Sequence, residues 1–152
     1  MKNQISVEAQ MLIRKPVEQV FQSFIDPAIT VHFWFTKSSG KLEIGKTVIW
    51  EWEMYGVKST AKVQDIIANE KIKVLWGQPE TLVEFNFKSL SPDRTYVTIH
   101  QRGFQQSGDE LLQVLIDSTG GFTTVLDGCK AYLEHGINLN LIADKFPKEA
   151  LL

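Results

Sequence analysis

The sequence predicts an α+β fold in which a curved antiparallel β-sheet wraps around a long C-terminal α-helix, with two short helices after the first strand. Apolar and polar side chains alternate from about residue 40 to residue 102, as in strands that bury one face. The last third of the chain changes to the helical period of 3.6 residues. A length of 152 residues, without linker or repeat, indicates one domain over residues 1–152 with a sizeable core.

The first third predicts a strand followed by two short helices. Residues 5–14 are rich in β-branched and aliphatic side chains, which favour a strand. Pro16 suits a first helical turn, and apolar residues then recur at helical spacing over 17–24. Asp26 before Pro27 is typical of the N-cap and first position of a helix, so a second short helix is expected here.

The central region predicts an antiparallel meander with one buried face. Polar or proline-containing turns at 69–71, 77–79 and 91–93 separate short alternating segments. The side chains that alternation places on the inner face include most of the aromatic residues of this region. They are Val48, Trp50, Trp52, Met54, Ile72, Val74, Trp76, Val83, Phe85 and Phe87.

The C-terminal region predicts a helix from about residue 119 to residue 143, with a less regular lead-in from about 109. Small and apolar residues fill one half of its helical wheel. These residues are Gly121, Phe122, Val125, Leu126, Gly128, Cys129, Tyr132, Leu133, Gly136 and Ile137. Gly121 and Gly128 share one line of that face, where small residues let bulky side chains approach. Close helix–sheet packing without space for a ligand is the alternative interpretation.

Composition and charge exclude several classes of protein. Sixteen basic and 18 acidic residues give a net charge of −2, too balanced for an electrostatic nucleic-acid binder. An apolar fraction of 43% and a charged fraction of 22% exclude a disordered chain. The single cysteine, Cys129, forms no internal disulfide, which excludes a disulfide-stapled secreted scaffold.

Targeting signals are also missing from the sequence. Residues 1–8 hold no apolar stretch of signal-peptide length, and no run approaches the ~20 apolar residues of a membrane span. We therefore expect a cytoplasmic protein without membrane insertion.

The usual catalytic and metal-binding motifs are absent, including the nucleotide-binding glycine patterns, the Gly-x-Ser-x-Gly elbow and His-Glu-x-x-His. The three histidines, His32, His100 and His135, lack ligand spacing. We expect no catalytic residue, metal or cofactor. Two residues are candidates for an acid or base if the protein is an enzyme. Asp65 alternates with apolar neighbours, and His100 could face water or the groove.

The inward aromatic side chains are the best candidates for a binding site, since wide rings with few polar partners suit an apolar ligand. They also suit a filled core, because each aromatic side chain buries about 150–250 Å². Cys129 lies among them as a small apolar residue on the helix. The candidate ligand-binding residues are Trp34, Trp50, Trp52, Trp76, Phe85, Phe87, Phe122 and Cys129.

The order of these motifs resembles a known family. The chain carries Lys15 to Phe21, Asp26-Pro27, Phe33-Trp34, the strand with Trp50 and Trp52, the strand end Thr95 to Phe104, and Gly121 to Gly136. This succession is similar to the homologues of the activator of the heat-shock-protein-90 ATPase (AHSA-like), of the START-related, helix-grip (SRPBCC) superfamily. That family usually has Trp where this chain has Phe122. The resemblance implies a helix-grip fold with a cavity between sheet and helix for apolar molecules.

Three functions follow from these observations. The first is binding of a small apolar or amphipathic molecule between the sheet and the C-terminal helix. The second is a cyclase-like or hydrolase-like enzyme that uses the same cavity. The third is a stress-related or chaperone-associated module, although the eukaryotic activators carry a further N-terminal domain for which this sequence has no room. A homodimer is also open, since an exposed edge strand could pair with a second copy.

Overall fold

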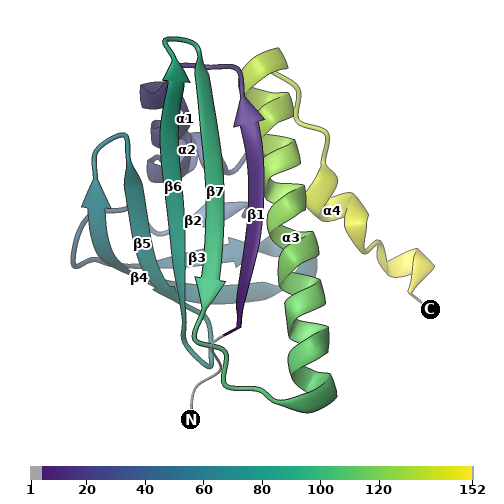
Figure 1. Cartoon of the computed structure of the whole chain (residues 1–152). Helices are drawn as coiled ribbons and strands as arrows, with labels where there is room; N and C mark the ends of the chain where they lie inside the picture. The colour runs from purple at the N-terminus through teal and green to yellow at the C-terminus, as the bar shows by residue number, and fades with distance from the viewer. Residues whose placement is uncertain (1–4, 152) are drawn as a thin grey trace.

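A seven-stranded antiparallel sheet and a 28-residue helix make up most of the computed structural model, which describes residues 5–151 (Figure 1). The strand order is β1-β7-β6-β5-β4-β3-β2. The predicted α+β helix-grip fold is confirmed. Residues 1–4, which carry part of the prediction about signal peptides, lie outside the described residues. The elements are β1 (Ser6–Ile13), α1 (Val17–Ile25), α2 (Pro27–Thr30), β2 (Lys37–Ser38), β3 (Thr47–Trp52), η1 (Glu53–Tyr55), β4 (Val57–Ile67), β5 (Lys71–Trp76), β6 (Thr81–Ser91), β7 (Arg94–Arg102), α3 (Gly108–His135), α4 (Leu141–Lys145) and η2 (Lys148–Ala150).

The two short helices form where the sequence predicts them. α1 buries Val20, Phe21 and Phe24; Phe24 follows the other two by four and three residues, so the three side chains share one face of the helix. Asp26 caps α2, because its Oδ1 accepts a hydrogen bond from the backbone N–H of Ala28 at 3.0 Å. Both helices lie behind the sheet in the view of Figure 1 and cover its inner face there.

The long helix differs from its predicted bounds. α3 begins at Gly108 and ends at His135, where Gly136 adopts a left-handed φ of 66°. The N–H of Gly136 bonds the carbonyl of Tyr132, and the N–H of Ile137 bonds that of Ala131. This C-cap stops the helix before residue 143. Gly136 and Ile137 are therefore exposed, and the residues beyond them form the separate helix α4.

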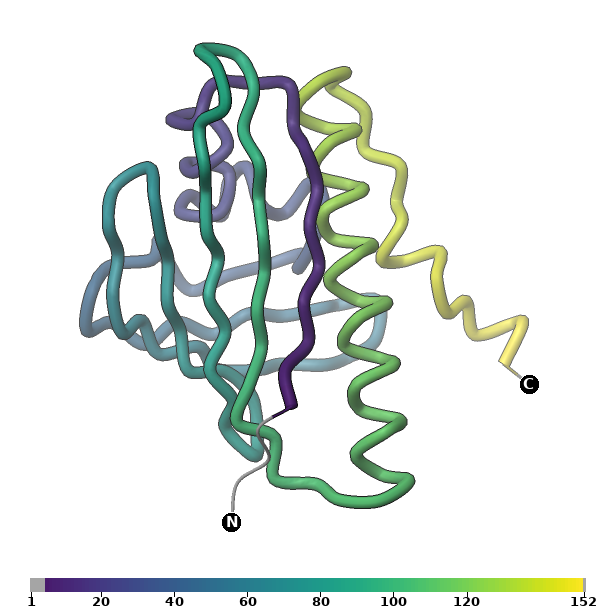
Figure 2. Tube along the Cα trace, viewed as in Figure 1, coloured from purple at the N-terminus to yellow at the C-terminus, as the bar shows by residue number. Residues whose placement is uncertain are grey.

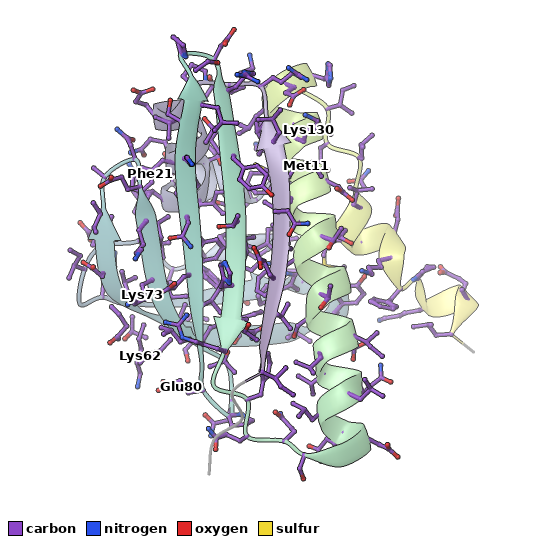
Figure 3. All side chains as sticks on the ribbon, in the orientation of Figure 1. Met11, Phe21, Lys62, Lys73, Glu80 and Lys130 are labelled. Atoms are coloured by element: carbon purple, nitrogen blue, oxygen red, sulfur yellow. The ribbon has the colours of Figure 1, made fainter. Side chains whose placement is uncertain are left out.

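The sheet is strongly curved, and α3 runs along its β1 edge (Figures 1 and 2). Side chains at the C-terminal end of α3 fix this contact. Lys130 Nζ donates to the carbonyl of Leu12 at 2.8 Å and to Glu134 Oε2 at 2.6 Å, and Figure 3 shows Lys130 beside β1. Glu134 also accepts from the backbone N–H of Arg14 at 2.9 Å. Burial alone would raise the pKa of Glu134, but these donors hold it below its ordinary value.

The core lies between the inner face of the sheet and the helices. Alternation is confirmed along the central strands: the inward residues Ile72, Val74, Val83 and Phe85 are each at most 1% exposed. Within residues 5–151, no helix is long and apolar enough to cross a membrane.

Candidate functional site

A pocket of about 940 Å³ lies between α3, the sheet and the C-terminal segment that carries α4. A volume of this size is at the upper end of what small-molecule sites offer. Its lining comes from five separate segments of the chain, which only the fold brings together. The lining residues are Trp34, Trp52, Tyr55, Val57, Trp76, Ile116, Asp117, Ser118, Gly120, Gly121, Phe122, Val125, Ile142, Lys145 and Phe146.

Four of the predicted ligand-binding residues meet at this pocket: Trp34, Trp52, Trp76 and Phe122. The ring centroids of Trp76 and Phe122 are 5.8 Å apart, and those of Trp34 and Phe122 are 6.0 Å apart. Trp52 lies 6.2 Å from both Trp34 and Trp76. These separations are ordinary for packed aromatic rings, so the four side chains support one another as a wall.

The other four predicted residues lie in the core and not among the residues that line the pocket. Trp50 stacks on Phe35 at 5.2 Å and is covered by Trp34 at 4.8 Å. Phe85 and Phe87 pack against Phe24. Their roles as ligand contacts stay predictions.

Cys129, the fourth of these, is completely buried. Burial raises the pKa of its thiol to about 12, although the Ser23 hydroxyl, 3.8 Å from the sulfur, acts in the opposite direction. The thiol is therefore protonated at neutral pH. It behaves as a small apolar side chain within the core and is a poor nucleophile.

The two helix glycines that share one line have different surroundings. A Cβ on Gly128 would lie 3.2 Å from the Cβ of Phe33, so this glycine permits close packing and does not face the pocket. A Cβ on Gly121 would meet nothing within 4 Å, and Gly121 lines the pocket. The helix is therefore closely packed at Gly128 and open to the pocket at Gly121.

The polar side chains at the pocket were not identified from the sequence; they are Tyr55, Asp117, Ser118 and Lys145. Tyr55 donates its hydroxyl to the carbonyl of Ile142 and so ties η1 to α4. Lys145 Nζ donates to Thr124 Oγ1 at 3.0 Å. The carboxylate of Asp117 accepts from Gln113 Nε2 at 3.0 Å. Lys145 was missed because the long helix was expected to run on to about residue 143; Gly136, a common C-cap residue, was the available signal that it ends earlier.

Asp65 and His100, the two acid or base candidates, lie on the outer face of the sheet. A register shift after Val63 interrupts the alternation of β4, so Asp65 pairs opposite Lys73, which is labelled in Figure 3. Directly opposed residues share a face, and Lys73 points away from the core. His100 lies 3.6 Å from Glu8 on the neighbouring strand. Neither residue lines the pocket.

Two smaller hollows lie elsewhere. One, of about 70 Å³, is lined by His32 and Gly128 among others, and the His32 ring stacks on Tyr132 at 4.4 Å. The other, of about 440 Å³, lies over the outer face and includes Lys71 and Thr98. Among residues 5–151, no group of three or more His, Cys, Asp or Glu side chains is arranged to hold a metal ion.

Comparison with known proteins places this geometry in a family. Residues 14–134 match the family described as Activator of Hsp90 ATPase homolog 1-like protein. No curated protein matches the chain. The structure of protein SSP2350 from Staphylococcus saprophyticus is similar, with a TM-score of 0.77 and 27% sequence identity over 89% of this chain and 96% of that one.

Two further structures share the fold at lower identity. The Aha1 dimer from Colwellia psychrerythraea gives a TM-score of 0.74 at 17% identity, over 87% of this chain and 98% of that one. DynU16, from the dynemicin biosynthetic locus, gives a TM-score of 0.76 at 18% identity, over 88% of this chain and 48% of that one. At these identities the likeness shows the fold alone.

Proposed function

The chain belongs to the family of Activator of Hsp90 ATPase homolog 1-like proteins, and from that membership we propose that it binds a small apolar or amphipathic molecule in the pocket between the sheet, α3 and α4. The observation that carries the proposal is the pocket of about 940 Å³, whose lining includes six aromatic side chains, among them the four predicted ones. A ligand there would remove apolar surface from water, at about 25 cal/mol per Å² buried before the costs of ordering.

The predicted residues divide into two roles under this proposal. Trp34, Trp52, Trp76 and Phe122 contact the ligand directly. We assign the second group a supporting place in the core, away from the pocket lining; it consists of Trp50, Phe85, Phe87 and Cys129. Half-exposed apolar side chains, including Val57 and Ile116, lie at the mouth, through which a ligand enters from solvent.

The test uses N-phenylnaphthylamine, a neutral aromatic probe that becomes fluorescent in apolar surroundings. Three of the four tryptophans line the pocket, so we expect bound probe to emit on tryptophan excitation. Gly121→Leu places a side chain in the pocket, and we expect it to weaken binding at least tenfold. The fold should survive, since Gly is about 1 kcal/mol worse than Leu or Ala inside a helix.

Thr123→Leu is the matched control, because it adds a leucine to the exposed side of the same helix and should leave the affinity unchanged. Saturable binding that Gly121→Leu leaves intact would place the ligand elsewhere. No saturable binding of this probe or of its anionic analogue would remove the proposal.

A chaperone-associated role is the second candidate function, and the family description is what supports it. The proposal further includes the cytoplasmic location expected from the sequence and leaves homodimer formation to be measured by sedimentation. An enzyme has less support, because Asp65 and His100 lie on the outer face. A pull-down with an Hsp90 chaperone, compared between the wild type and Gly121→Leu, separates chaperone contact from occupancy of the pocket.

A further inference from the structure

The lining of the pocket contains one cationic side chain, Lys145, and the fold holds it in a definite place. Its ammonium group donates to Thr124 Oγ1 at 3.0 Å on α3. It also lies 3.2 Å from the position that a Cβ of Gly120 would take. The missing side chain of Gly120 therefore lets the ammonium group approach the backbone of α3. Lys145 Nζ also lies 5.9 Å from the ring centroid of Phe146.

The charge of Lys145 is not matched by a carboxylate. Among residues 5–151, ten ion pairs involve other basic residues, and none joins Lys145 to an acidic side chain. Asp117, the one acidic residue in the pocket lining, accepts from Gln113 instead. The hydroxyl of Thr124 is itself used as a donor to the carbonyl of Gly120. Lys145 thus has two ammonium protons available for an acceptor at the pocket.

These observations define the chemistry of the ligand. The wall is aromatic and apolar, whereas the side formed by α4 offers a fixed cation without a counter-ion. We propose that the pocket selects amphipathic anions: molecules with an apolar, ring-bearing body and one carboxylate or similar anionic group, which pairs with Lys145. This inference deepens the proposed binding function and depends on it.

A pair of probes with the same ring system separates the two proposals. Anilinonaphthalene sulfonate carries one anionic group, and N-phenylnaphthylamine lacks it. An ion pair at an exposed site contributes about 0.2–1 kcal/mol. Lys145→Met keeps most of the side-chain length and removes the charge. We therefore expect it to weaken binding of the sulfonate about 1.4- to fivefold and to leave binding of the neutral probe unchanged.

Three controls make the result specific. Lys145→Arg keeps the charge and should restore most of the sulfonate affinity. Lys148→Met removes a charge from the same terminal segment outside the pocket and should change neither affinity. Raising the salt concentration should weaken binding of the sulfonate to the wild type, and much less to Lys145→Met, because salt screens exposed charges.

The outcomes are distinct. If neither probe binds saturably, the binding function itself fails. If both probes bind, but Lys145→Met changes both affinities alike or neither of them, binding in the pocket is supported and selection of an anion by Lys145 is wrong. A loss of affinity for the sulfonate alone in Lys145→Met supports the inference.

Discussion

Trp50 and Trp52 show what a single residue pattern can and cannot predict. Alternation along β3 predicted that both rings face inward, and both are buried. Only Trp52 lines the pocket, because Trp34 and Phe35 cover Trp50 from a different segment of the chain. Which inward ring meets a ligand depends on such tertiary neighbours, which the local pattern of β3 does not contain.

Asp65 is a second example at this scale. Strict alternation would have turned it inward, but the irregularity after Val63 moves it to the face of Lys73. A β-bulge adds one residue to one strand and reverses the alternation beyond it. No glycine marks this bulge in the sequence.

Cys129 gives a prediction about alkaline stability. Burial raises its pKa from the ordinary 9.0 to about 12, whereas the thiol of the unfolded chain ionises near 9. The unfolded state therefore loses this proton first, so the contribution of the neutral thiol is fully present below about pH 9 and is lost as the pH rises towards 12. Compared with Cys129→Ala, we expect the wild type to lose on the order of 1 kcal/mol more unfolding free energy between pH 8 and 10.

Urea denaturation of both proteins at several pH values measures this difference. Lysine and tyrosine titrations occur in both proteins and cancel in the comparison. Parallel pH curves for the two proteins would show that burial does not hold the thiol neutral.

At the scale of elements, the end of α3 decides where the pocket lies. Apolar residues continue at nearly helical spacing beyond Gly136, which is why the sequence predicted one helix to residue 143. The left-handed conformation of Gly136 breaks the helix instead and turns the chain back, so that Ile142, Lys145 and Phe146 form a wall of the pocket. The sequence therefore predicted the sheet face and α3 as walls, but not α4.

α4 is a five-residue helix, too short to be stable by itself. Tyr55 holds it, since the hydroxyl donates to the carbonyl of Ile142. A hydrogen bond of this kind contributes about 0.5–1.5 kcal/mol. We expect Tyr55→Phe to speed hydrogen exchange of the amides at 143–146 about two- to tenfold, with little change in the exchange of α3.

Tyr96→Phe is the control for this prediction, because Tyr96 lies on the outer face of β7, away from α4. Unchanged exchange at 143–146 in a folded Tyr55→Phe variant would mean that packing alone holds α4.

At the scale of the whole molecule, the order of strands and helices was readable from the sequence, because alternation and helical periodicity are local properties that the fold preserves. The position of empty space was not. It depends on how side chains from separate elements fill the sheet's concave face: the Phe24 ring packs against Phe85 and Phe87, and the Trp34 ring against Phe85. The pocket of about 940 Å³ lies nearer the middle of α3 and under α4.

Chemical-shift mapping by NMR tests the binding site most directly, because it reports each residue separately. N-phenylnaphthylamine is added to ¹⁵N-labelled protein, and the amide signals are followed to saturation. We expect the largest shifts at Gly120, Gly121 and Phe122, with little change at Lys71 and Thr98, which line the hollow on the outer face. Saturable shifts at Lys71 and Thr98 while Gly121 stays fixed, or no saturable shift anywhere, would contradict ligand binding between the sheet, α3 and α4.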